Sequence, residues 1–178
     1  MLRLQGENIY LAALTREDCK KLWEDTEYDF DNPTDTVLFG ASAENADKWF
    51  DDIQKAANEG VNVRLGIFLN DGTVVGDVAL QDIDKLNRSC TLGMGFSKME
   101  YRGKGYGRES ARLILKYGFH NMGLWRIWAS TLGPNIAAQK SLEGLGFMRE
   151  GIKRQAVYFC GEYVDELHYG MLRHEFNG

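Results

Sequence analysis

The segment Tyr101-Arg102-Gly103-Lys104-Gly105-Tyr106-Gly107-Arg108 stands directly before an amphipathic helix pattern. Glycines at every second position let consecutive backbone N–H groups turn toward one concave site. The start of the following helix adds the positive end of its dipole, so the segment is predicted to bind phosphate. The cationic side chains of Arg102, Lys104 and Arg108 reinforce that prediction in a chain whose net charge is -5.

The helix is predicted from apolar residues that recur every three to four positions between Ala111 and Met122, and Gly123 is expected to end it. The glycine segment is not a P-loop, because it lacks the Gly-Lys-Ser/Thr ending. Its last two glycines are also too close together for a dinucleotide fingerprint. A glycine-rich turn that binds no ligand is the alternative.

A second segment shows strand, turn and helix signals in succession. An apolar run from Arg126 to Leu132 precedes the turn Gly133-Pro134-Asn135, and a short helix pattern then continues to Gly146. Asn135 is predicted to cap this helix, and Gly146 is predicted to end it.

Together, Arg-x-x-Gly-x-Gly at 102–107 and Asn-x-x-Ala-x-x-x-Leu-x-x-Leu-Gly-Phe at 135–147 resemble the GNAT superfamily of acetyl-CoA-dependent N-acetyltransferases. The likeness is to its RimJ/RimL-like and spermidine-acetyltransferase-like branch, from about Val74 to Leu172 and more loosely from Leu2. It implies transfer of an acetyl group from acetyl-CoA to a primary amine: a small cationic amine, an amino acid or a peptide N-terminus. A ribosomal-protein N-terminal acetyltransferase and a non-catalytic acyl-CoA-binding or regulatory module remain alternatives.

The whole pattern predicts a mixed α/β fold with one domain over residues 1–178. Strands are expected over Leu2–Leu14, Val61–Leu69, Thr73–Ile83 and Cys90–Phe96, helices from Thr15 and Ser42, and a last hairpin from Val157 around Gly161. These elements predict a mixed, mostly antiparallel sheet with helices on both faces. The resemblance implies that the sheet is splayed between the strand ending near Phe96 and the strand Arg126 to Leu132, which creates the cofactor cleft.

Composition bounds the class of protein. The chain has 178 residues, 44% hydrophobic and 26% charged, which is typical of a soluble globular protein. It has no apolar run near the ~20 residues that span a bilayer and no signal-peptide layout, so a cytoplasmic location without membrane attachment is predicted. The acidic balance argues against nucleic acid and favours cationic substrates.

Cysteines and histidines give no sign of a metal site. The three cysteines are widely spaced and the three histidines are scattered, so neither a disulfide framework nor metal ligation is expected. The histidines are interpreted as surface or helix-end residues. Since no cysteine lies in either motif, direct attack of the amine without a covalent enzyme intermediate is predicted.

The predicted cofactor site combines backbone groups with side chains. The amides of residues 103–108 would bind the pyrophosphate, and the resemblance implies that Met94 to Ser97 pair with the extended arm and direct an N–H at the thioester. Asn135 matches the family position that contacts the cofactor near its sulfur, with a plain N-cap role as the alternative. The expected set is Met94, Phe96, Ser97, Arg102, Gly103, Lys104, Gly105, Tyr106, Gly107, Arg108 and Asn135.

The attacking amine must lose its proton. An α-amino group titrates near ~8 and a lysine-type amine near ~10.4, so a general base matters more for the second. Many relatives carry a glutamate at the position of Thr91 and a tyrosine at that of Leu142, and neither side chain here does that work in the same way. The remaining candidate catalytic residues are Asp82, Ser141 and Glu27.

Each candidate has an alternative. Asp82 is accompanied by Asp84 at a strand end, and Ser141 can equally be a packing residue. Glu27 belongs to an acidic stretch from Glu24 to Asp35, in which Asp29 is an equal candidate. This stretch is predicted either to recognise a cationic amine or to be a solvated loop.

Two further expectations concern the C-terminal hairpin. Asp165 is expected to make a strand-end hydrogen bond. The aromatic residues Tyr158, Phe159 and Tyr163 are expected to be exposed and to pair subunits into a homodimer.

Overall fold

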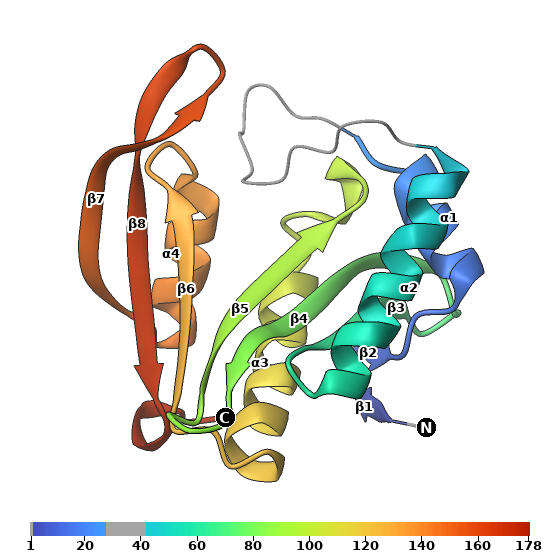
Figure 1. The fold of residues 1–178 in the computed structure, drawn as a ribbon, viewed down its shortest axis with the longest axis horizontal. Helices are drawn as coiled ribbons and strands as arrows, with labels where there is room; N and C mark the ends of the chain where they lie inside the picture. The colour runs from blue at the N-terminus through green and yellow to red at the C-terminus, as the bar shows by residue number, and fades with distance from the viewer. Residues whose placement is uncertain (1, 28–41) are drawn as a thin grey trace.

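The computed structural model describes residues 2–27 and 42–178, and within them eight strands form one sheet in the order β1-β2-β3-β4-β5-β6-β8-β7 (Figure 1). Only the pair β5–β6 is parallel among these strands. The strands are β1 (Arg3–Gln5), β2 (Ile9–Ala12), β3 (Val63–Leu69), β4 (Val74–Asp84), β5 (Ser89–Phe96), β6 (Arg126–Leu132), β7 (Met148–Phe159) and β8 (Glu162–Leu172). The predicted mixed, mostly antiparallel sheet is confirmed.

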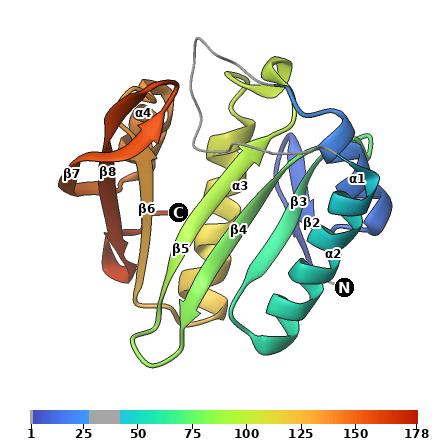
Figure 2. The same cartoon turned by 45° about the horizontal axis from the view of Figure 1, so that its top comes forward.

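Helices cover both faces of the sheet. The helices are α1 (Arg16–Glu24), α2 (Ala43–Glu59), α3 (Tyr106–Lys116) and α4 (Ile136–Leu145). Helices α1 and α2 pack over β2–β4, whereas α3 and α4 lie on the opposite face (Figures 1 and 2). Each face has its own apolar cluster, because Leu22 and Ile53 pack with Phe68 on one side, while Ile114 and Phe119 pack with Val78 on the other.

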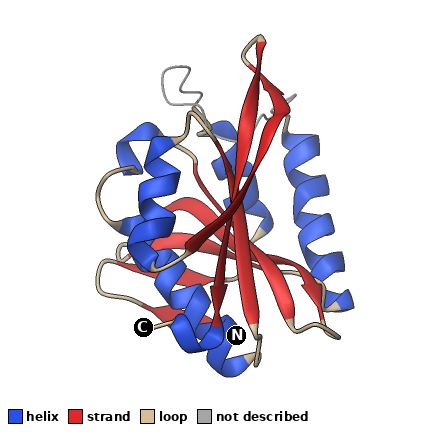
Figure 3. Ribbon diagram, turned by 90° about the vertical axis from the view of Figure 1, so that its left-hand side faces the viewer, coloured by secondary structure: helices blue, strands red, loops and turns tan. Residues whose placement is uncertain are grey.

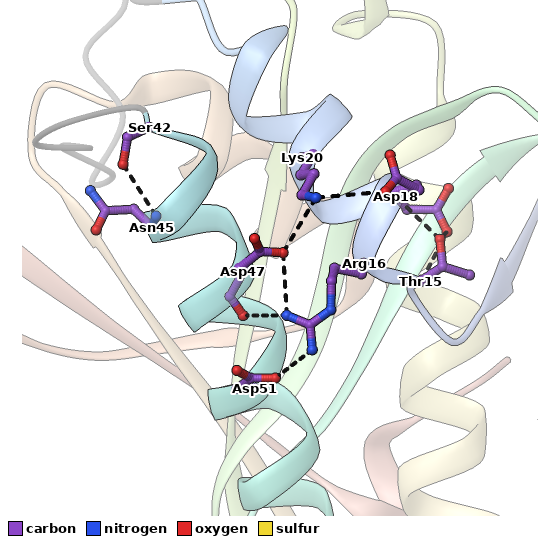
Figure 4. A network of polar contacts seen from close by, with 9 residues as sticks. Thr15, Arg16, Asp18, Lys20, Ser42, Asn45, Asp47 and Asp51 are labelled. Atoms are coloured by element: carbon purple, nitrogen blue, oxygen red, sulfur yellow. Dashed lines mark hydrogen bonds and ion pairs between the residues drawn. The ribbon is translucent and has the colours of Figure 1, made fainter.

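The α1–α2 pair is held by local caps and by ion pairs (Figure 4). Thr15 and Asp18 form the predicted capping box, and Ser42 Oγ accepts the N–H of Asn45 at 3.2 Å, as its predicted N-cap role requires. The guanidinium of Arg16 lies 2.8 Å from Asp51 and 3.2 Å from the carboxylate of Asp47 on α2. This network joins α1 to α2 within the helical layer.

The first strand differs from the sequence prediction. The single strand expected over residues 2–14 is wrong, because the chain turns at residues 6–8 and forms β1 and β2 as a hairpin. The carboxylate of Glu109 on α3 accepts the N–H groups of Glu7 and Asn8, which stabilises this turn. Sequence periodicity alone does not reveal so distant a partner.

Two other boundaries also shift. The helix expected to continue to Met122 is α3 followed directly by a π-helical turn (Tyr117–Asn121), and Gly123 ends it with φ 70°. The last hairpin is longer than predicted, since β7 already begins at Met148. It projects beyond the rest of the sheet (Figure 3).

The sheet is split between β5 and β6. In the described residues these strands pair only through Ser89–Arg126, Cys90–Ile127 and Thr91–Trp128, after which they diverge (Figure 1). We call β1–β5 with α1–α3 the N-terminal half, and β6, β8 and β7 with α4 the C-terminal half. The predicted splay is confirmed.

None of the helices in the described ranges has the length and apolarity to cross a bilayer.

Candidate active site

The backbone of β5 has two different edges. Ser97 N–H donates to Val75 O at 3.1 Å, which shows that the odd-numbered residues of β5 bond to β4. Because antiparallel bonding alternates, the N–H and C=O groups of Met94 and Phe96 point toward β6. Pairing with β6 ends at Thr91, so these groups line an edge that no described strand covers.

Ser97 differs from its neighbours in the predicted set. Its side chain is buried, its hydroxyl also donates to Val75 O at 3.3 Å, and its carbonyl accepts the N–H of Glu27 at 2.8 Å. Since its own N–H already bonds to Val75, Ser97 has no N–H left for a cofactor arm. Of the four residues expected to supply amides, Met94 and Phe96 are the two with the required direction.

The glycine segment adopts the bend that its spacing predicts. A short 3-10 turn (Met99–Tyr101) leads into Gly103 at φ 74° and Gly105 at φ 87°, left-handed conformations that favour glycine. A Cβ on either glycine would meet no described atom within 4 Å. The backbone conformation, and not crowding by the protein, therefore accounts for both glycines, and the segment leaves space for a ligand.

The N-terminus of α3 differs from those of the other described helices. Side-chain oxygens cap α1, α2 and α4, whereas Gly105 at the start of α3 offers no side chain. The first bond of α3 joins Glu109 N–H to Gly105 O at 3.0 Å, so the N–H groups of residues 106–108 precede the helical ladder. Three N–H donors at the positive end of a helix dipole suit a phosphate group.

Gly107 brings this helix end against the open edge of β5. A Cβ at Gly107 would lie 3.3 Å from side-chain carbons of Met94 and of Phe96. The two β5 residues thus support the first turn of α3 with their side chains, while their backbone groups face the split. Tyr106 is half-buried and packs against the same core.

The three cationic residues of the segment lie in different surroundings. Lys104 is exposed, while Arg102 is half-buried and its N–H donates to Met99 O at 3.0 Å. The guanidinium of Arg108 reaches α4, where a Cβ on Gly144 would approach its Nη2 to 2.8 Å. Arg108 therefore connects the two helices that flank the split on one face of the sheet.

Asn135 makes the predicted N-cap. Its Oδ1 accepts the N–H of Ala138 at 3.1 Å, and Gly146 ends α4 at φ 99°. The amide nitrogen of Asn135 is not used by this cap, so the contact with a cofactor that the resemblance implies stays a prediction.

Glu27 is engaged in a structural contact. Its carboxylate accepts the N–H of Met99 at 2.9 Å, and its own N–H bonds to Ser97. Next to it, Asp25 lies 3.1 Å from both Lys21 and Lys98. Burial alone would raise the pKa of Asp25, but hydrogen bonds from Lys98 and Lys21 outweigh it and lower that pKa.

These contacts attach the end of α1 to the chain that leads into the glycine segment. Asp25 and Glu27 of the acidic stretch are thereby engaged within the protein, whereas Glu24 is exposed. Asp29, the equal candidate to Glu27, lies outside the described residues, as do Asp31 and Asp35.

Asp82 lies at the other end of β5. It is exposed, with φ 52°, in the bulge where the β4–β5 register shifts next to the Gln81–Thr91 pair. Thr91 and Ser97 are separated by about 20 Å of extended strand. Asp82 and Glu27 are therefore too far apart to act together on one amine.

Asp84 has a turn role. Its carboxylate accepts the N–H groups of Leu86 and Asn87 at 2.9 Å. Hydrogen bonds from Asn87 lower its pKa, which keeps the carboxylate ionised.

The two positions that depart from the family pattern offer no acid or base here. Leu142 is buried in the core, and Thr91 Oγ1 is buried without a hydrogen-bond partner in the described part of the chain. Ser141 is half-buried on α4, and its catalytic role stays a prediction.

A polar cluster lies on the face of the C-terminal half opposite α4. His168 Nε2 is 2.8 Å from Glu166 Oε2, and Lys153 Nζ is 3.0 Å from the same oxygen. The ring of Trp128 stacks on His168 with centroids 6.1 Å apart. The interpretation of His168 as a surface or helix-end residue is wrong, because it lies on β8 with its side chain only 22% exposed.

This cluster borders a pocket, and sequence reasoning did not find it. The pocket has a volume of about 330 Å³ and is lined by Arg126, Trp128, Glu150, Lys153, His168 and Tyr169. The sequence pattern that could have indicated this site is on β8, where polar Glu166 and His168 alternate with buried Leu167 and Tyr169.

Asp165 makes the hydrogen bonds expected of a strand-end residue. Its carboxylate accepts the N–H of Gln155 at 2.8 Å in a β7 bulge, and its carbonyl accepts the N–H of Gly133 at 2.8 Å. Asp165, Gln155 and Arg154 line a second hollow of about 690 Å³. At the hairpin tip Tyr158 and Tyr163 pack edge to face and are each 65% exposed, whereas Phe159 is half-buried and not exposed as expected. The homodimer stays a prediction.

Comparison with known proteins identifies relatives of this chain. YokL, an SPbeta prophage-derived uncharacterized N-acetyltransferase of Bacillus subtilis (strain 168), is 29% identical over 172 residues, 96% of this chain and 93% of YokL. The spermidine N(1)-acetyltransferase of Escherichia coli (strain K12) is 27% identical over 106 residues, 60% of this chain and 56% of that protein.

Solved structures share the fold. The ribosomal alpha-N-protein acetyltransferase RimL in complex with coenzyme A superposes with a TM-score of 0.84, covering 96% of this chain and 98% of RimL at 17% identity. The acetyltransferase (GNAT) domain family matches residues 8–148. The protein is thus an acetyltransferase that belongs to the GNAT family.

Proposed function

We propose that this acetyltransferase takes its acetyl group from acetyl-CoA and transfers it to a primary amine by direct attack. The observation that carries the proposal is the uncapped N-terminus of α3, which follows Gly103 and Gly105 and lies against the open edge of β5. The N–H groups of residues 106–108 would bind the pyrophosphate. Those of Met94 and Phe96 would pair with the extended arm.

The residues present fit this donor. The positions around Gly103 and Gly105 leave room for phosphate oxygens, and two N–H groups on one strand edge match an arm that carries amides. When bound, acetyl-CoA supplies a thioester carbonyl whose carbon accepts the amine. An N–H of β5 directed at the carbonyl oxygen would stabilise the charge that develops there.

Direct attack is supported by the cysteines. Burial raises the pKa of both the Cys19 and the Cys90 thiols to about 12, which keeps them protonated and poorly nucleophilic. Cys160 is exposed at the β7–β8 turn. The two buried thiols are therefore poorly suited to carry the acetyl group.

We propose a small-molecule or peptide amine as the acceptor, ahead of a specific ribosomal protein. The spermidine acetyltransferase among the relatives supports a small amine, and the RimL likeness supports the alternative of a protein N-terminus. Asp25 and Glu27 are engaged within the protein, so they give little support to an acidic recognition rim. Residues 1–178 are proposed to act as one domain in the cytoplasm, without nucleic acid as a partner.

The donor site can be tested with two matched glycine variants. Gly72 (φ 92°) also has a left-handed conformation and open space around it, but it lies in the β3–β4 turn. Gly105→Ala and Gly72→Ala therefore introduce similar backbone strain, of about 1–3 kcal/mol. We expect only Gly105→Ala to weaken acetyl-CoA binding, by roughly tenfold or more, an effect worth about 1.4 kcal/mol in calorimetry.

Two outcomes would contradict the proposal. One is folded wild-type protein that does not bind acetyl-CoA at millimolar concentration, and the other is equal affinity of both glycine variants. Thiol release from acetyl-CoA with polyamines, amino acids, aminoglycosides and short peptides would then identify the acceptor class.

A further inference from the structure

We propose that His168 is the general base of acetyl transfer, and that Glu166 is a positioning residue that orients its imidazole. This inference rests on the proposed function, because it needs the thioester to lie in the split between β5 and β6. It supplies the proton acceptor that Thr91 does not offer.

Strand register locates His168 beside the split. His168 pairs with Ser130 across β6 and β8, and Ser130 lies two residues beyond Trp128, the last residue of β6 that pairs with β5. Neighbouring strands are about 4.8 Å apart, so the imidazole lies one strand away from the diverging edge. Met94, whose N–H faces the split, lies three residues beyond Thr91 on the opposite side.

The side chain of His168 is on the face where an acceptor can approach. Ile127 and Ala129 of β6 are buried toward α3 and α4, so the alternate residues Trp128 and Ser130 face the other way. Trp128 stacks on His168, which places the imidazole on that side too. Helices α1 and α2 cover this face over β2–β4, away from the C-terminal half (Figures 1 and 2).

The ionisation state of Glu166 selects the tautomer of His168. Burial would raise the pKa of Glu166, but hydrogen bonds from Lys153, His168 and Ser130 outweigh it and lower that pKa. An ionised carboxylate only accepts hydrogen bonds, so the nitrogen 2.8 Å away, Nε2, carries the proton. The lone pair is then on Nδ1, which can accept a proton from an amine.

A second observation on the same face points to a polar ligand. Thr91 pairs with Trp128, and its buried Oγ1 lacks a hydrogen-bond partner in the ranges that the structure describes. A polar group of the acceptor bound over Trp128 would lie between this hydroxyl and His168. His168 and Trp128 also help to line the pocket of about 330 Å³, which provides space for a ligand on this face.

The reaction step balances without a further reactant. The lone pair of the amine nitrogen forms the C–N bond with the carbonyl carbon, and the C–S bond breaks with its electron pair on sulfur. The amine proton passes to Nδ1 of His168 and from there to the thiolate or to solvent. The charged groups around the imidazole are Glu166 on its own strand, Lys153 and Glu150 on β7, and Arg126 on β6.

The test compares His168→Gln with His174→Gln in the complete chain. His174 is a matched control, because it also packs near a tryptophan, Trp125, with centroids 6.0 Å apart at the opposite end of β6. We expect His168→Gln to lower kcat by about 10²–10⁴ with acetyl-CoA affinity unchanged. His174→Gln should leave both unchanged.

A readout in the free protein tests the positioning role. Nitrogen NMR of the His168 ring should show a protonated Nε2 and a bare Nδ1, and Glu166→Gln should abolish that preference and lower kcat less than His168→Gln does. The exposed Glu162→Gln is the control for charge and should change neither. Added imidazole should partly restore turnover to His168→Ala.

The outcomes separate the two proposals. Wild-type protein that fails to bind acetyl-CoA refutes the proposed function before any variant is made. Intact binding together with near-normal kcat in His168→Gln overturns the role of His168 alone, as does an equal loss in His174→Gln. If His168→Gln does not fold, an unchanged ring tautomer and kcat in Glu166→Gln overturn the inference.

Discussion

The two halves of the sheet differ in how they are covered. Strands β2–β4 lie between α1–α2 on one face and α3 on the other, with an apolar cluster on each side. In the C-terminal half α4 covers one face, and most residues of β7 are exposed. The strands of the two halves pair only through residues 89–91 and 126–128 of the described chain.

This contrast separates two kinds of recognition. On the N-terminal side of the split, the groups available to a ligand are mainly backbone N–H groups, whose directions are fixed by a buried scaffold. On the C-terminal side they are mainly side chains on a face without a helix. A scaffold buried on both faces suits a donor that is always the same, whereas an open face can vary with the acceptor.

The largest expected effect tests whether the stability of the molecule resides in the doubly covered half. Ile67 on β3 is fully buried, whereas Ile152 on β7 is 51% exposed. Ile67→Ala should lower the free energy of unfolding by about 2–5 kcal/mol, because it leaves a cavity. Ile152→Ala should lower it by less than about 1 kcal/mol. Equal losses of unfolding free energy for the two variants in urea denaturation would contradict this difference between the halves.

A smaller effect is expected where α3 contacts the β1–β2 turn. Glu109→Gln removes the ionised acceptor of the Glu7 and Asn8 N–H groups and should lower stability by about 1–3 kcal/mol at neutral pH. Burial would raise the pKa of Glu109, but the hydrogen bonds from Asn8 and Glu7 outweigh it and lower that pKa. Glu162→Gln, exposed in the C-terminal half, is the control.

The sign of the pH dependence follows from this shift. A carboxylate whose pKa is lower in the folded state stabilises the protein above its unfolded pKa of about 4.3, and this contribution is lost as pH falls through the folded value. The stability gap between wild type and Glu109→Gln should therefore be full at pH 7 and shrink in acid. A gap that widens below pH 4 would contradict the role of Glu109.

The smallest effect is expected in the C-terminal half. The guanidinium of Arg126 forms a two-point contact with Glu150 and lowers the pKa of that carboxyl, but both side chains are more than 30% exposed. Glu150→Gln should lower stability by less than about 1 kcal/mol, and ~1 M salt should reduce the difference further. A loss of stability as large as that of Ile67→Ala would mean that the C-terminal half contributes as much to the free energy of unfolding as the N-terminal half does.

The sequence predicts local features well. Features that depend on neighbouring residues are confirmed. They are the turn at Gly103 and Gly105, the apolar face of α3, and the helix caps made by Thr15, Ser42 and Asn135. The splay is implied by family resemblance and is confirmed by the register of β5 and β6.

Features that depend on distant partners were not predicted. The hydrogen bond from Ser97 N–H to Val75 O and the hydrogen bond from Met99 N–H to Glu27 join segments that are far apart in the chain. The pairing of Lys153 with Glu166 and the stacking of His168 on Trp128 depend on the register of β7, β8 and β6. Periodicity gives the face of a strand but not the residue that lies opposite on the next one.

The open edge of β5 has a consequence for sequence divergence. Its hydrogen-bond donors are main-chain groups, which recur on one edge about every 6.7 Å and are carried by every amino acid except proline. Replacement of Met94 or Phe96 by other apolar residues changes the packing against Gly107 while the donors stay in place. The proposed backbone contacts with the donor therefore tolerate other apolar residues at these two sites over evolutionary time, as long as proline is avoided there.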